Sequence, residues 1–292
     1  CFVANDTRKT YLYTSEKIDG PWKKQLIEGF YHDGSLLFDE DGRNYIVYGN
    51  DEIWITELNE DLTAPKKDGL HRLLVSDHKN PELGYEGSHI QKINGYYYIF
   101  LIHSLRDRWM RTEACFYSDS LEGEFTGGDV LCDDRGYCGQ GVAQGGIVDT
   151  PDGKWYAMLF QDSGAVGRIP ILLPVTWKDH FPVFGQNGHV PEEIEVHSTR
   201  PGYIYQPLVG SDDFCNGLLP RWQFNHDPDP RYYHLDALQG TYTITTREVC
   251  TELTQAVNTL TQRMSYPSCA AEVTVDASAL KAVSYTHLTL PT

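Results

Sequence analysis

Three segments of the sequence repeat one hairpin design, and this repeat constrains the fold more than any other feature. Each segment places Asp-Gly or Asn-Gly between two runs of apolar and aromatic residues: FDEDGRNYIVYG (38–49), QKINGYYYIFLI (91–102) and VDTPDGKWYAMLF (148–160). Such a dipeptide predicts a tight β-hairpin in which both central residues have positive φ. A weaker copy without glycine, VANDTRKTYLYTS, begins at Val3.

The spacing of the hairpins indicates how they are arranged. The turn glycines Gly42, Gly95 and Gly153 are separated by 53 and then 58 residues, without helical periodicity between them. Repeated antiparallel units of this size predict an all-β fold of the β-propeller type, in which similar sheets surround an axis. A β-sandwich is the competing interpretation, although an in-register repeat is less natural there.

A polar residue stands nine positions before each turn glycine: Asp33 in YHDGSLLF, Glu86 in YEGSHIQK and Gln144 in AQGGIVD. In a radial array, equivalent positions on the innermost strands converge near the axis, so we expect these residues to share a pocket. Two carboxylates in one pocket can carry the acid–base chemistry of glycoside cleavage. The alternative is that both acids cap strand entrances by binding turn amides.

The composition narrows the range of ligands. The 292 residues carry a formal net charge of −17, which argues against nucleic acid or an anionic membrane as a partner. No apolar run is long enough to predict a membrane-spanning helix. Nineteen tyrosines and six tryptophans fit a neutral ligand such as a sugar, although aromatics also fill β cores. Seven cysteines without a CxxC pair favour a reducing compartment, so localisation stays open with a lean to the cytoplasm.

The ends of the chain predict that it is a fragment. It begins at Cys1, already inside a strand-like run, with neither an initiator methionine nor a signal peptide. The last ten residues, VSYTHLTLPT (283–292), break the preceding alternation, and we expect them to be a non-native tail.

Between these ends we expect two domains. A partial propeller covers 1–195, and a polar, proline-bearing linker covers 196–209. A truncated β-sandwich covers 210–282, with strands predicted from the alternating stretches TYTITT (241–246) and AEVTVDAS (271–278).

At the motifs quoted above the sequence resembles glycoside hydrolase family 43, the five-bladed propeller enzymes that act on xylan and arabinan side chains. The segment GAVGRIPILLPVTW extends the match, and WQFNHDPDP (222–230) resembles the start of the concanavalin-like β-sandwich appended to β-xylosidase-like members. The resemblance implies that the first blade and part of the second are missing.

The family is inverting and uses three carboxylates. By motif, Glu86 matches the general acid, and Asp33 matches the aspartate that modulates the pKa of the acid and orients it. The general base belongs to an earlier Asp-Pro motif, which the resemblance places upstream of Cys1, so the fragment is expected to be inactive. The implied enzyme is a β-xylosidase or α-L-arabinofuranosidase. The alternatives are a non-catalytic carbohydrate-binding propeller and a propeller glycosidase acting on fructans or arabinan.

The resemblance also suggests substrate-binding residues for a xylo- or arabinoxylo-oligosaccharide. Arg168 matches an arginine that contacts sugar hydroxyls, with a structural ion pair as the alternative. Gln144 replaces a histidine associated with a central metal or water in many members, so no cofactor is expected and a structural Ca²⁺ is disfavoured. His32 could bind a carboxylate or line the pocket. Trp109 could stack on sugar or belong to the core.

Overall fold

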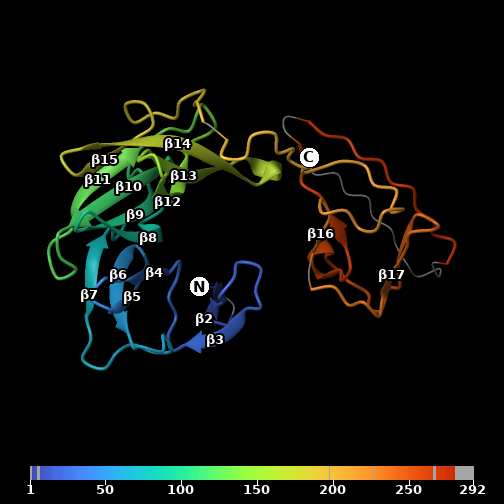
Figure 1. Ribbon diagram of the computed structural model, residues 1–292, viewed down its shortest axis with the longest axis horizontal. Coiled ribbons are helices and arrows are strands. Elements are labelled where there is room, and N and C mark those ends of the chain that lie inside the picture. The colour runs from blue at the N-terminus through green and yellow to red at the C-terminus, as the bar shows by residue number, and fades with distance from the viewer. Residues whose placement is uncertain (1, 5–6, 197, 226, 266–267, 280–292) are drawn as a thin grey trace. The chain divides into compact units, whose positions relative to one another are not determined.

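The computed structural model describes residues 2–4, 7–196, 198–225, 227–265 and 268–279 (Figure 1). Apart from two short 3₁₀ turns, at Gly164–Val166 and Leu253–Gln255, the regular structure of these residues is β-strand, which confirms the all-β prediction. Within the described ranges, no helix has the length and apolarity needed to cross a lipid bilayer.

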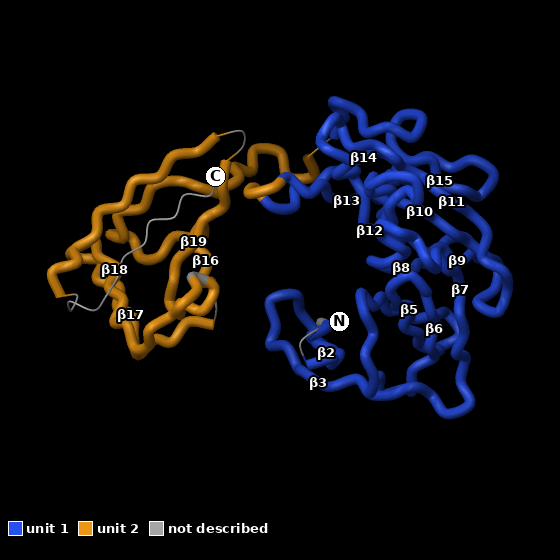
Figure 2. The backbone as a smooth tube through the Cα atoms, turned by 180° about the vertical axis from the view of Figure 1, so that it is seen from behind, with its two compact units in different colours: residues 1–163, 167–196 blue, residues 164–166, 197–292 orange. Residues whose placement is uncertain are grey.

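The chain divides into two compact units, which Figure 2 colours separately. The first consists of Cys1–Ser163 and Gly167–Val196, and the second of Gly164–Val166 and His197–Thr292. Each unit is described by itself below.

The first unit consists of four antiparallel sheets, each built from strands that are consecutive in the sequence. The first sheet has three strands and the other three have four: β1 (Phe2–Ala4), β2 (Lys9–Thr14), β3 (Lys23–Ile27); β4 (Ser35–Phe38), β5 (Asn44–Asn50), β6 (Glu52–Leu58), β7 (His71–Ser76); β8 (Glu86–Ile93), β9 (Tyr96–Ser104), β10 (Arg111–Ser118), β11 (Thr126–Leu131); β12 (Ala143–Asp149), β13 (Trp155–Asp162), β14 (Arg168–Lys178), β15 (Phe181–Phe184). The leading strands of the four-stranded sheets are in contact, β4 with β8 and β8 with β12. Successive four-stranded meanders that meet along their first strands are propeller blades, as predicted.

The hairpin turns follow the prediction in one case and depart from it in two. Asn94-Gly95 forms the expected two-residue turn, with φ of 51° and 85°. At the other two turns the prediction that both central residues have positive φ was wrong. There the loop is longer and the positive φ belongs to the glycine, 82° at Gly42 and 78° at Gly153. A type I turn completed by a left-handed glycine gives the same reversal of chain direction.

Apolar clusters fill the spaces between successive sheets. Two of the tyrosines that follow the turn glycines, Tyr45 and Tyr98, are buried members of these clusters, whereas the third, Tyr156, is half-buried and lies outside them. Burying a large side chain of this kind stabilises the fold by about 1.5–3 kcal/mol. Part of the aromatic content that suggested a sugar ligand therefore belongs to the core.

A buried ion pair joins the hairpin of the second sheet to the third sheet. Asp39, beside the β4–β5 turn, accepts hydrogen bonds from Lys92 Nζ at 2.6 Å and from the Tyr97 hydroxyl at 2.5 Å. Burial alone would raise the pKa of Asp39, but these two hydrogen bonds, a third from the Glu40 amide and the charge of Lys92 together lower the pKa. The contact holds the hairpin ends of β4 and β8 against each other.

The second unit has short strands around an aromatic cluster. β16 (Gln223–Phe224) pairs with β19 (Leu260–Thr261), and β17 (Tyr233–Asp236) pairs with β18 (Thr241–Ile244). The predicted strand in 241–246 is therefore present as β18.

The other predicted strand of this unit, at 271–278, was wrong, because that stretch has no regular structure. Its alternating valines, Val273 and Val275, are exposed. Alternation favours a strand only where a neighbouring strand is available to pair with it and to cover its apolar face. The predicted tail, 283–292, lies outside the described residues, and the predicted domain boundaries stay predictions.

Candidate active site

The strand entrances that carry the in-register residues lie next to one another. Asp33 comes two residues before β4, Glu86 is the first residue of β8, and Gln144 is the second of β12. Buried Ser88 links the first two entrances, because its hydroxyl lies 2.9 Å from the carbonyl oxygen of Asp33 and 3.2 Å from that of Val47. The structure thus brings Asp33 and Glu86 together.

The carboxylate of Glu86 is held by an amide from the preceding sheet. An antiparallel bridge pairs Asp51 with Tyr85, whose carbonyl accepts a 2.9 Å hydrogen bond from the Asp51 amide. This register sets Asn50 opposite Glu86, and Asn50 Nδ2 donates to Glu86 Oε2 at 2.7 Å. The direction of the carboxylate is therefore fixed by a neighbouring sheet.

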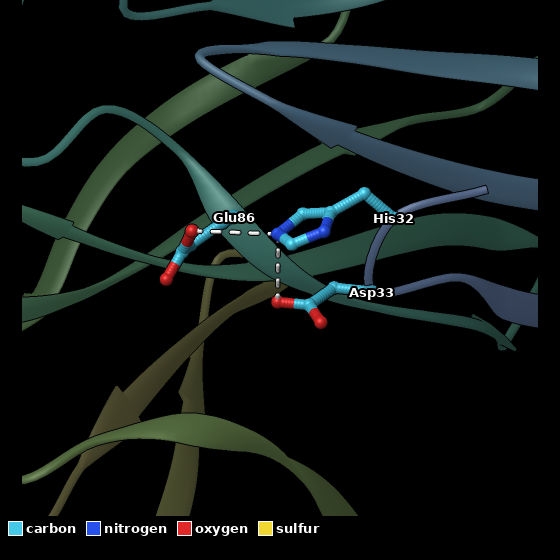
Figure 3. Close-up of side chains that lie close together, drawn as sticks. All are labelled: His32, Asp33 and Glu86. Atoms are coloured by element: carbon cyan, nitrogen blue, oxygen red, sulfur yellow. Dashed lines mark ion pairs between the residues drawn. The ribbon is translucent and has the colours of Figure 1, made fainter. Parts of the chain in front are cut away.

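His32 lies between the two carboxylates (Figure 3). Its Nε2 is 3.7 Å from Oδ2 of Asp33 and 3.7 Å from Oε2 of Glu86. The three side chains are between 23% and 35% exposed, so the cluster is partly enclosed and open to solvent. A neutral His32 leaves two like charges facing each other, whereas a protonated His32 attracts both.

The spacing of the two carboxylates limits their roles. One oxygen of Asp33 and one of Glu86 lie within 4.8 Å of each other. The acid and base of an inverting glycosidase stand about 6.5–9.5 Å apart to leave room for water, and those of a retaining enzyme about 5–5.5 Å apart. This oxygen–oxygen separation leaves little room for a water between the two carboxylates, so Asp33 is placed to orient Glu86 rather than to act as the base of an inverting pair.

The third in-register residue, Gln144, lies beside Glu86 through Gly87. A Cβ atom at position 87 would come within 2.7 Å of Cγ and Nε2 of Gln144. Gly87 also has a φ of 65°, in the left-handed region that favours glycine. A larger residue there would displace the glutamine and strain the strand entrance that carries the acid.

A fully buried acid holds the backbone of Gln144. Gln144 has a φ of 64°, and its amide donates to Glu113 Oε2 at 2.6 Å. Burial raises the pKa of Glu113 well above its ordinary value, against the opposing effects of this hydrogen bond and of Arg111. Burial therefore favours the neutral form of Glu113.

Arg168 opens β14 and is paired in register with Asp162, the last residue of β13. Its Nε lies 3.3 Å from Asp162 Oδ1, and its guanidinium carbon lies 4.4 Å from the centre of the Phe160 ring. Arg111, on β10, also binds Asp162. Burial lowers the pKa of Arg111, while Asp162 and, more weakly, Glu86 act in the opposite direction. Arg111, Asp162 and Arg168 thus form an arginine cluster, and its member Arg111 lies within electrostatic range of Glu86.

Trp109 lies in the connection between β9 and β10 and is partly exposed. It packs against Gly139, where a Cβ atom would come within 2.5 Å of its carbonyl oxygen. The contact places the indole of Trp109 beside the loop that contains Gly139. Trp109 itself stands two residues before Arg111 in the sequence. Its role in sugar stacking stays a prediction.

Sequence reasoning missed three residues of the site: Asn50, Arg111 and Asp162. The repeat carried a signal for the first. Asn50 stands eight residues after its turn glycine, and the equivalent positions in the next two repeats are also polar, His103 and Gln161. Arg111 and Asp162 belong to different sheets, and their meeting follows from the packing of the blades rather than from a motif.

Comparison with protein families identifies the chain. The profile of glycosyl hydrolases family 43 matches residues 2–182. The chain belongs to glycosyl hydrolases family 43. The profile of the beta xylosidase C-terminal concanavalin A-like domain matches residues 211–284, which supports the predicted sandwich after the propeller.

Individual relatives agree with this membership. The beta-xylosidase of Formosa agariphila is 26% identical over 280 residues, which cover 82% of this chain and 46% of the relative. Xylosidase/arabinosidase 43B of Humicola insolens is 26% identical over 294 residues, which cover 92% of this chain and 53% of the relative. A solved structure, the bifunctional GH43-CE protein of Bacteroides eggerthii, is 42% identical with a TM-score of 0.76, covering 91% of this chain and 34% of that one. The chain spans about half the length of the curated relatives it matches.

Proposed function

We propose that the chain carries the acid half of an inverting glycosidase site, which releases terminal xylose or arabinofuranose from xylan- or arabinoxylan-derived oligosaccharides. The observation that carries the proposal is the pairing of Glu86 with Asp33 across two adjacent blades, with the carboxylate of Glu86 directed by Asn50. Family membership supports glycoside hydrolysis as the reaction class.

In this proposal Glu86 protonates the glycosidic oxygen as the bond to the sugar breaks. An acid that protonates the leaving group must approach it from one direction, and the hydrogen bond from Asn50 supplies that direction. Asp33 influences the protonation and orientation of the acid from within 4.8 Å. Water attacks the opposite face of the sugar, activated by a third carboxylate that the family resemblance assigns to an earlier Asp-Pro motif.

The polar groups around Glu86 suit a small sugar. His32 and Gln144 flank the acid, and Arg168 offers an exposed guanidinium within the arginine cluster. Such groups donate to sugar hydroxyls, while Trp109 could supply a stacking face. The names of the relatives include both xylosidase and arabinosidase, which supports a pentose at the cleavage point without separating the two.

The residues fit a metal cofactor poorly. Gln144 replaces the histidine that the family associates with a central metal, and its side chain packs against Gly87. Ca²⁺ takes six to eight oxygen ligands, of which an amide supplies one neutral oxygen. We therefore propose that no metal is required, and that His32, Asp33 and Glu86 serve the reaction rather than an ion.

The stereochemistry of the first product tests this proposal. The parent enzyme, meaning this chain completed by the proposed base, is mixed with an aryl β-xyloside and followed by ¹H NMR before the product mutarotates. Inversion gives α-xylose first. Initial release of β-xylose would mean that the close pair Asp33 and Glu86 works as a retaining site. If the protein binds xylose but does not hydrolyse the xyloside, the alternative function, a non-catalytic carbohydrate-binding propeller, would be supported instead.

A further inference from the structure

The side chain of Arg168 is 63% exposed, so the position of its guanidinium needs an explanation. A free arginine side chain samples many rotamers, and holding one of them costs conformational entropy. We propose that Arg111 and Asp162 are positioning residues of the sugar site, which hold the guanidinium of Arg168 in one position. This inference rests on the proposed function, because Arg168 is the residue assigned there to the sugar.

Asp162 bridges the two arginines with separate oxygens. Its Oδ2 accepts a 2.5 Å hydrogen bond from Arg111 Nη1, and its Oδ1 lies 3.3 Å from Arg168 Nε. A carboxylate with one arginine on each oxygen has no free rotation about its last bond, so the position of one guanidinium constrains the other.

Phe160 adds a second constraint between the same two arginines. The guanidinium carbon of Arg111 lies 4.8 Å from the ring centre and that of Arg168 lies 4.4 Å from it. Both distances are within the range of a cation–π contact. Phe160 and Asp162 are two residues apart on β13 and therefore point to the same face of the sheet.

The two arginines differ sharply in burial, and this difference shows which of them holds the other in place. The side chain of Arg111 is 4% exposed, and that of Asp162 is 37% exposed. Arg111 is therefore fixed by packing, and Asp162 passes this fixed position on to the exposed Arg168. Asp162 and Arg168 are also directly paired across β13 and β14, so the contact needs no long reach.

The cluster connects the sheet of Glu86 with the next sheet. Arg111 belongs to β10, in the same sheet as β8 and Glu86, while Asp162 and Arg168 belong to β13 and β14. Glu113, two residues after Arg111, binds the amide of Gln144 on β12. Strand β10 therefore fixes the positions of two substrate-binding candidates of the neighbouring sheet, Arg168 and Gln144. It belongs to the same sheet as Glu86, so both candidates are positioned with respect to the acid.

The test compares Asp162→Asn with a matched control, Asp152→Asn. Asp152 also forms an ion pair, 3.2 Å from Lys154, but it lies outside the strands, in the turn that joins β12 to β13. Both variants are made in the full 292-residue chain, and their thermal unfolding is recorded first. If D162N does not fold, R111M/D162N takes its place, because it leaves no buried charge without a partner.

The first measurement does not depend on sugar. Phenylglyoxal modifies free guanidinium groups, and mass spectrometry of peptides gives its rate at Arg168. We expect this rate to rise several-fold in D162N and to stay unchanged in D152N. An unchanged rate in D162N overturns the inference, whatever the protein does with sugar.

The second measurement is the affinity for xylose and arabinose, by NMR titration. We expect roughly tenfold weaker binding in D162N, because a displaced guanidinium no longer meets the sugar, and unchanged binding in D152N. If D162N raises the phenylglyoxal rate at Arg168 but leaves the affinity for sugar unchanged, the arginine cluster has only a structural role. That result would overturn the positioning role. Absence of binding by the unaltered chain would count against the proposed function, while the phenylglyoxal rates still decide whether Asp162 holds Arg168.

Discussion

Asn50 and Glu86 are joined by a 2.7 Å hydrogen bond between strands of two different sheets, 36 residues apart in the sequence. The bond follows from the backbone bridge between the neighbouring residues Asp51 and Tyr85. The direction of the candidate acid is thus built into the contact between two blades.

Replacing Asn50 with alanine tests this contact. Without the amide the carboxylate of Glu86 is free to rotate, so we expect kcat/KM of the parent enzyme on xylobiose to fall by about tenfold or more. Asn44→Ala is the control, because Asn44 lies at the other end of the same strand. Equal rates for N50A and the unaltered enzyme would show that the hydrogen bond does not direct the acid.

The buried pair of Asp39 and Lys92 predicts a loss of stability in Asp39→Asn. Lys92 keeps some exposure, so we expect the free energy of unfolding to fall by about 1–3 kcal/mol, below the loss typical of fully buried pairs. Urea denaturation of the 292-residue chain measures this. Asp41→Asn removes an exposed pair with Arg43 on the same hairpin and should cost less than about 1 kcal/mol.

The same pair predicts a pH dependence. The pKa of Asp39 is lowered below its ordinary 3.8, so its contribution to stability is present above pH 3.8 and is lost as the pH falls through the lowered pKa. The difference between the unaltered chain and D39N should therefore shrink on acidification below about pH 4. A constant difference down to pH 2 would contradict the assigned ionisation.

Glu113 predicts a pH dependence of the opposite sign. Its pKa is raised above 4.5, so its contribution to stability is complete below pH 4.5 and is lost as the pH rises toward the raised pKa. Glu113→Gln keeps an acceptor for the Gln144 amide and cannot ionise. We expect E113Q to gain stability relative to the unaltered chain as the pH rises from 4.5 to neutrality, in thermal unfolding at several pH values.

A matched substitution separates the charge of Glu113 from its hydrogen bond. Glu113→Ala removes the acceptor and leaves a cavity, so it should destabilise the chain at every pH, by roughly 2–4 kcal/mol. If E113Q were as damaging as E113A at neutral pH, a neutral Glu113 would be excluded.

Chelation tests the absence of a metal requirement. The amide of Gln144 is a weak metal ligand, so treatment with EDTA should leave the affinity for xylose within about twofold of its starting value. Isothermal titration before and after treatment measures this. Loss of binding that added Ca²⁺ restores would show that a metal supports the site.

Much of the first unit could be predicted, because its hairpins are encoded locally. Turn glycines and alternating strands specify the three four-stranded sheets, and a repeat in register brings Asp33 and Glu86 to neighbouring strand entrances. The loop types at Gly42 and Gly153 and the false strand at 271–278 depend on pairing partners, which local sequence does not reveal. The contacts of Arg111 with Asp162 depend on how two blades pack, and no spacing rule contains them.

The central claim is that Glu86 donates the proton to the leaving group, and leaving-group dependence in Glu86→Gln tests it most directly. An acid is needed for xylobiose, whose leaving group is a sugar alkoxide, but hardly for a dinitrophenyl xyloside, whose leaving group departs unprotonated. We predict that E86Q lowers kcat of the parent enzyme on xylobiose by about 10²–10⁴-fold and on the dinitrophenyl xyloside by less than about tenfold. Equal losses on both substrates, or an unchanged rate on xylobiose, would contradict the assignment.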